Sequence, residues 1–246
     1  MMRPFLFFLL YVGLLHPVSG QKKQLEHSDF AHWKTLGNTV ISADGKWVSY
    51  NLTPGEGDET LIIHQTESGE NFVFPRGSRA SFTANNSHAA FLVKVPKLTL
   101  DSLRRKKVKS EDLPKDTLFL FQTATGNVTK IPKVRRFAVP EKWSGWIVYH
   151  KEIEKSEGKK KKEGIQTGTQ FVIQSTTDTF SFTMPFTKAF QVAEEVPGLV
   201  LHATGDDENN LPGIYFFDGL TRKLRPVYRG KGEFDNLAID RKAKQI

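Results

Sequence analysis

The stretch Ser42-Ala43-Asp44-Gly45-Lys46-Trp47-Val48-Ser49-Tyr50 joins a tight turn to an apolar strand, and this pattern returns along the chain. Asp and Gly reach the backbone angles of tight turns at low cost, and aromatic and β-branched residues favour strands. A second copy lies at 83–91, weaker copies end at 146–149 and 199–202, and a last one begins at 240. The chain is therefore predicted to be a series of β-hairpins.

The spacing of the copies indicates the kind of β-fold. Taken as equivalent, Trp47, His88, Trp146, Leu199 and Gln245 lie 41, 58, 53 and 46 residues apart. Four-stranded propeller blades repeat at about this period. The second half of each unit also repeats, since 60–69 matches 117–126 almost residue for residue. We therefore expect an all-β chain, a partial β-propeller of about four four-stranded antiparallel blades plus an incomplete fifth.

The expected units are a signal peptide at 1–20, a lead-in at 21–38 and an incomplete propeller at 39–246. Within the propeller, we expect blades at about 39–80, 81–136, 137–188 and 189–232, with a partial blade at 233–246. Residues 25–36 could form one or two helical turns, and no other stretch has a convincing helical period. Because the last repeat stops two residues into a strand, we expect either the N-terminal part of a longer protein or a prematurely ended reading frame.

The first twenty residues predict export. Arg3 supplies a positive start, residues 5–15 are apolar, and Val18-Ser19-Gly20 offers small residues for cleavage. A membrane anchor is the alternative for this segment. No later stretch is apolar enough to cross a bilayer, so we expect no membrane span after cleavage and a periplasmic or extracellular protein. The chain has no cysteine, which excludes disulfides, thiolate metal sites and a cysteine nucleophile.

The formal charge of +8 is partly local. The basic runs at 104–109 and 159–162 fall where the blade spacing is longest, so we interpret them as solvent-exposed insertions. A nucleic-acid site would place such runs on a folded face with interleaved aromatic residues, and we expect no nucleic-acid partner.

Few residues suggest chemistry. The chain contains neither a Gly-x-Ser-x-Gly nucleophile elbow nor a His-Glu-x-x-His metal motif. One histidine falls in or beside a strand of each expected blade: His64, His88, His150 and His202. They could be ligands round a central channel or ordinary strand residues, and we favour ordinary strand residues. The carboxylate clusters Glu194-Glu195 and Asp206-Asp207-Glu208 present no obvious facing pair, because adjacent strand residues point to opposite faces.

Two further groups of residues have structural and functional interpretations. Trp143 and Trp146 could form a binding platform, although a blade core needs the same large rings. The N-glycosylation pattern occurs at Asn51, Asn85 and Asn127. We predict no catalytic, cofactor-binding or metal-binding residue, and no cofactor.

Four segments together resemble a known family: 32–36, 41–50, 143–149 and 212–218. The chain after the signal resembles the N-terminal propeller of exported bacterial prolyl oligopeptidase family serine peptidases, particularly the long Bacteroidetes-type proteins. The resemblance implies a propeller that caps an α/β-hydrolase domain with a Ser-Asp-His triad near the C-terminus. That domain is missing from this sequence, so no catalytic residue can be carried over to it.

The resemblance predicts a chain that is not an enzyme by itself. In an intact serine peptidase it would gate the access of peptide substrates and dock the absent α/β-hydrolase domain. A stand-alone binding propeller in the envelope is the alternative. A glycosidase that uses Glu195 or Asp207 is a third hypothesis, because some glycosidases are propellers with paired carboxylates.

Overall fold

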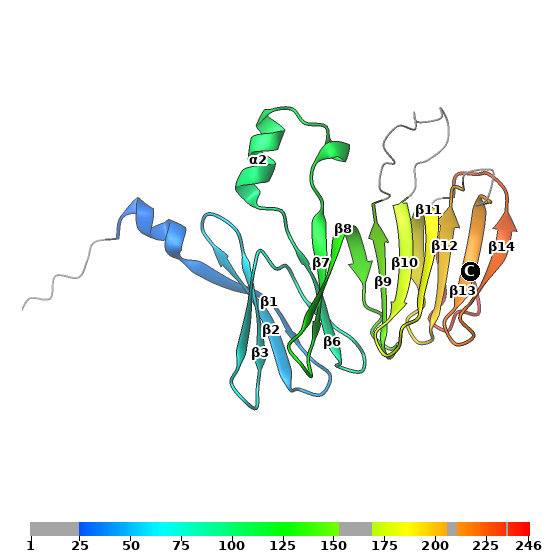
Figure 1. The fold of residues 1–246 in the computed structure, drawn as a ribbon, viewed down its shortest axis with the longest axis horizontal. Coiled ribbons are helices and arrows are strands. Elements are labelled where there is room, and N and C mark those ends of the chain that lie inside the picture. The colour runs from blue at the N-terminus through cyan, green and yellow to red at the C-terminus, as the bar shows by residue number, and fades with distance from the viewer. Residues whose placement is uncertain (1–24, 153–168, 206–210, 235) are drawn as a thin grey trace, which may run out of the picture.

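The structure is a computed structural model, and it describes residues 25–152, 169–205, 211–234 and 236–246. The predicted signal peptide and the basic run at 159–162 lie outside the described residues. The described residues form fourteen strands in two antiparallel sheets, β1–β4 and β5–β14, and within each sheet every strand pairs with its neighbours in the chain. Figure 1 shows them following one another from β1 to β14.

The strands group into four blades. The first contains β1 (Lys34–Ile41), β2 (Trp47–Pro54), β3 (Thr60–Gln65) and β4 (Asn71–Pro75). The second contains β5 (Ser81–Phe82), β6 (His88–Val93), β7 (Asp116–Gln122) and the start of β8 (Val128–Ala138). The third contains the rest of β8, β9 (Trp146–Lys151), β10 (Thr169–Ser175) and the start of β11 (Ser181–Val192). The fourth contains the rest of β11, β12 (Gly198–Ala203), β13 (Gly213–Asp218) and β14 (Lys223–Arg229).

Two strands are shared because the chain passes from one blade to the next without a loop. Val134 in β8 pairs with β7 and with β9, and Thr187 in β11 pairs with β10 and with β12. The residue before each of them has a positive φ, 60° at Lys133 and 54° at Phe186. Arg76 has a φ of 64° where the first blade meets the second. A left-handed residue therefore turns the chain at every crossing between consecutive blades.

The predicted hairpin turns are present. Ser42 N donates to Trp47 O at 2.9 Å, and Gly45, the αL residue of that turn, has a φ of 70°. The matching bonds of the later copies are Thr83 N to His88 O, Ala193 N to Gly198 O and Asp240 N to Gln245 O, at 2.9, 2.8 and 3.1 Å. Gly198 thus occupies the position that the sequence assigned to Leu199. That assignment was wrong by one residue, because the apolar run Leu199-Val200-Leu201 obscures where the strand begins.

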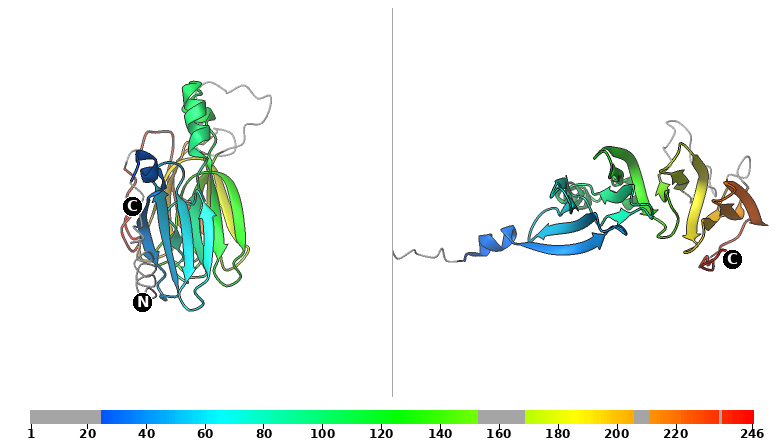
Figure 2. Two further views of the ribbon diagram at one scale, coloured as in Figure 1. Left: turned by 90° about the vertical axis from the view of Figure 1, so that its left-hand side faces the viewer. Right: turned by 90° about the horizontal axis from the view of Figure 1, so that it is seen from below.

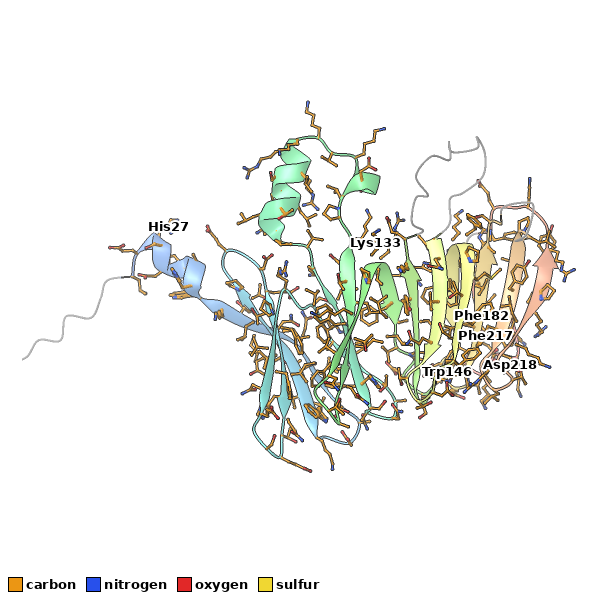
Figure 3. The ribbon with its side chains drawn as sticks, in the orientation of Figure 1. His27, Lys133, Trp146, Phe182, Phe217 and Asp218 are labelled. Carbon is orange, nitrogen blue, oxygen red and sulfur yellow. The ribbon has the colours of Figure 1, made fainter. Side chains whose placement is uncertain are left out.

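Three apolar clusters lie between consecutive blades and hold them together. The first interface joins blades one and two and includes Trp47, Leu61, Phe91 and Phe121. The second joins blades two and three through residues such as Leu120 and Tyr149. The third joins blades three and four, where Phe182 and Phe217 stack with their ring centroids 5.5 Å apart (Figure 3). Alternate residues of each inner strand face opposite neighbours, as a two-residue period requires.

The array does not close. Strands of blade one pair with no strand of blade four among the described residues, and Figure 2 shows the two blades at opposite ends. On blade one, Leu36, Ile41 and Val73 are more than half exposed. On blade four, Val200, Ile214 and Phe216 are buried, and an added Cβ at Gly198 would lie 2.8 Å from Ala243. The final turn therefore packs closely on blade four. The predicted all-β partial propeller is confirmed.

Helix was the weakest part of the sequence interpretation. The 3₁₀-helix η1 (His27–His32) precedes β1, and the short 3₁₀-helix η2 (Ser110–Asp112) precedes β7. The α-helix α2 (Lys97–Arg105) stands between β6 and β7, in a stretch where we found no convincing helical period. Its apolar stripe toward the sheet is only Leu100 and Leu103, too short to show a period. No described helix has the length and hydropathy needed to span a bilayer.

Phe121 tests the blade-to-blade packing. It is fully buried, and its ring lies within 6 Å of the rings of Trp47, Phe72 and Phe74. Phe121→Ala is expected to lower the free energy of unfolding by about 3–5 kcal/mol, because the lost contacts leave a cavity. Urea denaturation measures this. Leu220→Ala, at a side chain that is 78% exposed, is the control and should change stability by less than about 0.5 kcal/mol. Equal effects of the two changes would contradict an interface held by ring packing.

Candidate functional site

The four histidines singled out in the sequence all lie in strands, but they do not form a common site. His64 is in β3, whereas His88, His150 and His202 are in the second strands of blades two, three and four. His64 Nδ1 lies 2.9 Å from Asn71 Oδ1 on the neighbouring strand. His202 contacts the Phe234 ring edge-to-face. Among the described residues, no group of three or more His, Asp or Glu side chains could hold a metal ion.

His88 makes the one serine–histidine contact that could suggest a nucleophile. Ser87 Oγ lies 2.9 Å from His88 Nδ1, and it donates to Asn85 Oδ1 at 2.8 Å. The serine proton is therefore directed at the amide oxygen, and the imidazole nitrogen donates to the hydroxyl instead of accepting from it. Burial lowers the pKa of His88, and no carboxylate contacts its ring among the described residues. The contact stabilises a hairpin turn and does not activate a hydroxyl.

Among the described residues, His150 has the most strongly shifted pKa. It is 5% exposed and lies edge-on to the rings of Phe171 and Phe190 in the third interface. Its Nε2 has no hydrogen-bond partner. Burial, with the nearby charges of Arg136 and Arg135, lowers its pKa from 6.5 to about 4. The ring is therefore neutral at physiological pH and packs as an aromatic side chain.

Glu194 and Glu195 are part of an ion-pair cluster at the final turn. Arg241 Nε lies 2.7 Å from Glu194 Oε2, and Arg241 Nη2 lies 3.3 Å from Glu195 Oε1. Lys142, before β9, reaches the same carboxylates at 3.4 and 3.9 Å. The hydrogen bond from Arg241 is the main reason that the pKa of Glu194 is lowered. The pair thus joins blades three and four to the start of the fifth repeat. Asp206, Asp207 and Glu208 lie outside the described residues.

Other residues singled out in the sequence lie in turns and cores. Trp143 and Trp146 are 1% and 7% exposed, and Trp143 Nε1 donates to Ala193 O at 3.0 Å. Asn51 is fully buried, so the folded protein gives no access for glycosylation there. Asn85 is half-buried, and Asn127 is exposed in the β7–β8 turn. Neither tryptophan can offer an open platform for a ligand.

A cavity of about 390 Å³ lies between blades one and two, beneath α2. The β2–β3 loop supplies Asp58 and Glu59, the first blade crossing supplies Arg76, and the end of β6 supplies Lys94. Leu100 of α2 and Val95 add apolar surface, and Asp116 lies at the start of β7. Figure 1 shows the helix standing at one end of β6 and β7.

Hydrogen bonds fix the walls of this cavity. Asp58 Oδ1 accepts from Lys97 N at 3.0 Å, which ties the first turn of α2 to blade one. Asp116 Oδ1 accepts from Val95 N at 3.1 Å. Glu59, with a side chain 16% exposed, pairs with Lys94 Nζ at 2.6 Å and also accepts from Asn51 Nδ2 at 3.0 Å. The cavity is therefore preformed by contacts from four separate segments.

This cavity was not predicted from the sequence, and none of its residues was singled out as a site residue. Its residues come from positions 53 to 116, and none of them belongs to a short motif. The available signal was the long spacing between β6 and β7, which was interpreted as a solvent-exposed insertion. A length difference shows where an insertion occurs, but not which loop of another blade it meets.

No protein-family model matches this chain, and no curated protein matches it by sequence. Among solved structures, an acylaminoacyl peptidase in complex with Z-Gly-Gly-Phe-chloromethyl ketone is 13% identical with a TM-score of 0.46, covering 82% of this chain and 34% of that one. Pyrococcus horikoshii acylaminoacyl peptidase is 12% identical with a TM-score of 0.45, covering 81% and 33%.

The β-propeller domain of the Trilobed protease from Pyrococcus furiosus, described as having an open velcro topology, is 15% identical with a TM-score of 0.44. The match covers 80% of this chain and 58% of that domain. The chain spans about a third of the length of the acylaminoacyl peptidases. Our assignment of the propeller fold rests on the strand pairing described above.

The pKa of His150 predicts acid sensitivity. The unfolded state binds a proton near pH 6.5, whereas the folded state resists protonation down to about pH 4. The stability contribution of the neutral ring is thus complete above pH 6.5 and is lost as the pH falls toward 4, by up to about 3 kcal/mol. Urea denaturation at pH 7.5, 6, 5 and 4.5 measures this loss. His150→Leu should flatten the pH dependence even if it lowers stability throughout, and an unchanged slope would contradict this assignment.

Arg241→Gln is expected to loosen the final turn. Its bonds to Glu194 and Glu195 are lost, whereas the Asp240 carboxylate still accepts from Gln245 N at 2.8 Å. Hydrogen exchange of residues 240–246 should become faster, and the exchange of β12 should stay the same. High salt should have the same effect on the parent protein, because exposed ion pairs are screened. Lys244→Gln is the matched control and should leave exchange unchanged. Protection that is insensitive to both Arg241→Gln and salt would argue that the ion pairs do not hold the turn.

Proposed function

We propose that this chain is the non-catalytic propeller portion of a prolyl oligopeptidase-like serine peptidase. In the intact enzyme it gates the access of peptide substrates and docks an α/β-hydrolase domain that this sequence does not contain. The proposal extends to an exported protein that acts in the periplasm or outside the cell. The observation that carries it is the open array of blades, considered together with the ordered segments that resemble this family.

Three of the resembling segments lie in inner strands of blades one, three and four. Residues 41–50 contain the first hairpin turn and the first half of β2, residues 143–149 lead into β9, and residues 212–218 contain β13. They contribute Trp47, Trp143, Trp146 and Phe217 to the interfaces between blades. The resemblance thus involves residues that shape the propeller. It supports a likeness between this chain and the propeller of the family, and it does not extend to the α/β-hydrolase domain.

The exposed apolar face of blade one supports a larger assembly. A propeller buries such a face by packing its last blade on its first, and here Leu36, Ile41 and Val73 are open to solvent. The first hairpin of a fifth repeat is formed, since Asp240 N donates to Gln245 O. Further blades packed on this face would close the ring.

The experiment is to identify the native form of the protein in the organism that encodes it. An antibody raised against the purified chain should recognise a species much heavier than 27.9 kDa, and a fluorophosphonate probe should label that species on an active serine. The 246-residue chain expressed alone is the control, and we expect no label on it. Labelling should disappear after treatment with a serine-hydrolase inhibitor, and the species should cleave short peptides.

Two outcomes would overturn the proposal. A native species that has the size of this chain and carries no label would favour the stand-alone binding propeller of the envelope. A heavier species without label would place the propeller in another kind of multidomain protein. Sequencing the gene beyond the codon for Ile246 tests the peptidase proposal independently, because such a peptidase requires a downstream nucleophile elbow.

A further inference from the structure

The cavity between blades one and two is lined by charges of both signs, and they differ in how they are paired. Lys94 is neutralised by Glu59 at 2.6 Å, and Arg104 lies 3.7 Å from Asp101. Among the described residues, Asp58 and Asp116 accept hydrogen bonds from neutral backbone N–H groups, and neither forms an ion pair. Two carboxylates of the cavity are thus hydrogen-bonded but not compensated.

Two cations of the cavity, the exposed Lys97 and the half-buried Arg76, have no ion-pair partner among the described residues and balance the two carboxylates. Arg76 is the more firmly held of the two. Its backbone is held on both sides, since its N–H donates to Glu59 O at 2.8 Å and its carbonyl accepts from Lys94 N at 2.9 Å. Its half-buried side chain lines the cavity, and the guanidinium has no hydrogen-bond or ion-pair partner among the described residues. A left-handed backbone at φ 64° therefore presents a planar cation to the cavity from a rigid position.

We propose that this cavity binds a small zwitterion of the amino acid or dipeptide class. The Arg76 guanidinium pairs with the carboxylate of the ligand, and Asp58 and Asp116 attract its ammonium group. A purely anionic ligand would be repelled by Asp58 and Asp116, and a purely cationic one by Arg76 and Lys97. Val95 and Leu100 supply apolar wall for a short side chain. The volume of about 390 Å³ suits a molecule of this size and excludes a longer peptide from being enclosed.

The site is independent of the proposed peptidase function, because its residues lie within blades one and two and in α2. The helix α2 is part of the wall of the cavity. Asp58 of blade one accepts a hydrogen bond from the first turn of α2 and also lines the cavity with its carboxylate, so blade one and the insertion of blade two form one continuous wall. Binding of the ligand is expected to protect α2 from hydrogen exchange, because the helix covers the bound molecule.

Calorimetry on the purified chain tests the proposal with three matched probes: glycyl-leucine, its N-acetyl form and its C-terminal amide. Glycyl-leucine should bind, and each blocked form should bind roughly tenfold more weakly or not at all, because one charged end is removed. Equal binding of the three probes, or no binding of glycyl-leucine at millimolar concentration, would overturn the proposal. This comparison uses only the parent protein, so it does not depend on how any variant folds.

Variants then assign the two ends of the ligand. Arg76→Gln should weaken glycyl-leucine binding roughly tenfold or more by removing the partner of the carboxylate. Asp116→Asn keeps the oxygen that accepts from Val95 N but removes the charge, so it should weaken the binding of glycyl-leucine while leaving that of the N-acetyl form unchanged. Lys133→Gln is the matched control, because Lys133 occupies the equivalent left-handed position at the next crossing, outside the cavity. Unchanged affinity in Arg76→Gln, or equal loss in Lys133→Gln, would reject the site.

Discussion

Every blade of this protein depends on the apolar face that it shares with the next blade. A four-stranded sheet has two faces, and an isolated one would leave most of its aliphatic and aromatic side chains in water. Trp47, Phe91 and Phe121 therefore join blades one and two, and Leu199, Leu201 and Phe217 bury their side chains against blade three. Stability in such an array comes from contacts between neighbours. The first blade has only one neighbour, so its outward face remains apolar and exposed.

The left-handed crossings allow these faces to meet. The chain leaves the outer strand of one blade and must begin the inner strand of the next without losing its hydrogen bonds. Arg76, Lys133 and Phe186 adopt a positive φ at this point, and their carbonyls accept from the residues just past β6, β9 and β12. None of the three is glycine, so each crossing costs about 1 kcal/mol of backbone strain, which the surrounding hydrogen bonds offset. The bend is therefore set by the ladder of the following blade and not by a flexible residue.

The sequence predicted what is local and repeated. The turns at Gly45, Asn86 and Ala243 share one geometry, and so do the turns that end at Gly69 and Gly126, because each is determined by a few adjacent residues. The register of β12 was wrong by one position, since an unbroken apolar run has no internal marker. The helix α2 was missed because Asp58, which is distant in the sequence, anchors its first turn. The crossings were not predicted, because Arg76 and Lys133 carry no preference for a positive φ.

The cavity could not be predicted, because it too depends on contacts between residues that are distant in the sequence. Its position follows from a residue of the second strand that differs from blade to blade. Asn51, Leu92, His150 and His202 occupy the same place in the second strand of their blades and face the following blade. Leucine there continues the apolar interface. Histidine packs as a neutral ring, as at His150, whose neutrality makes the third interface sensitive to acid. Asparagine instead donates to Gly77 O and Glu59, so polar contacts replace the apolar core at that end of the first interface. A polar opening at the crossing, roofed by an insertion, lets Arg76 project its side chain into the cavity.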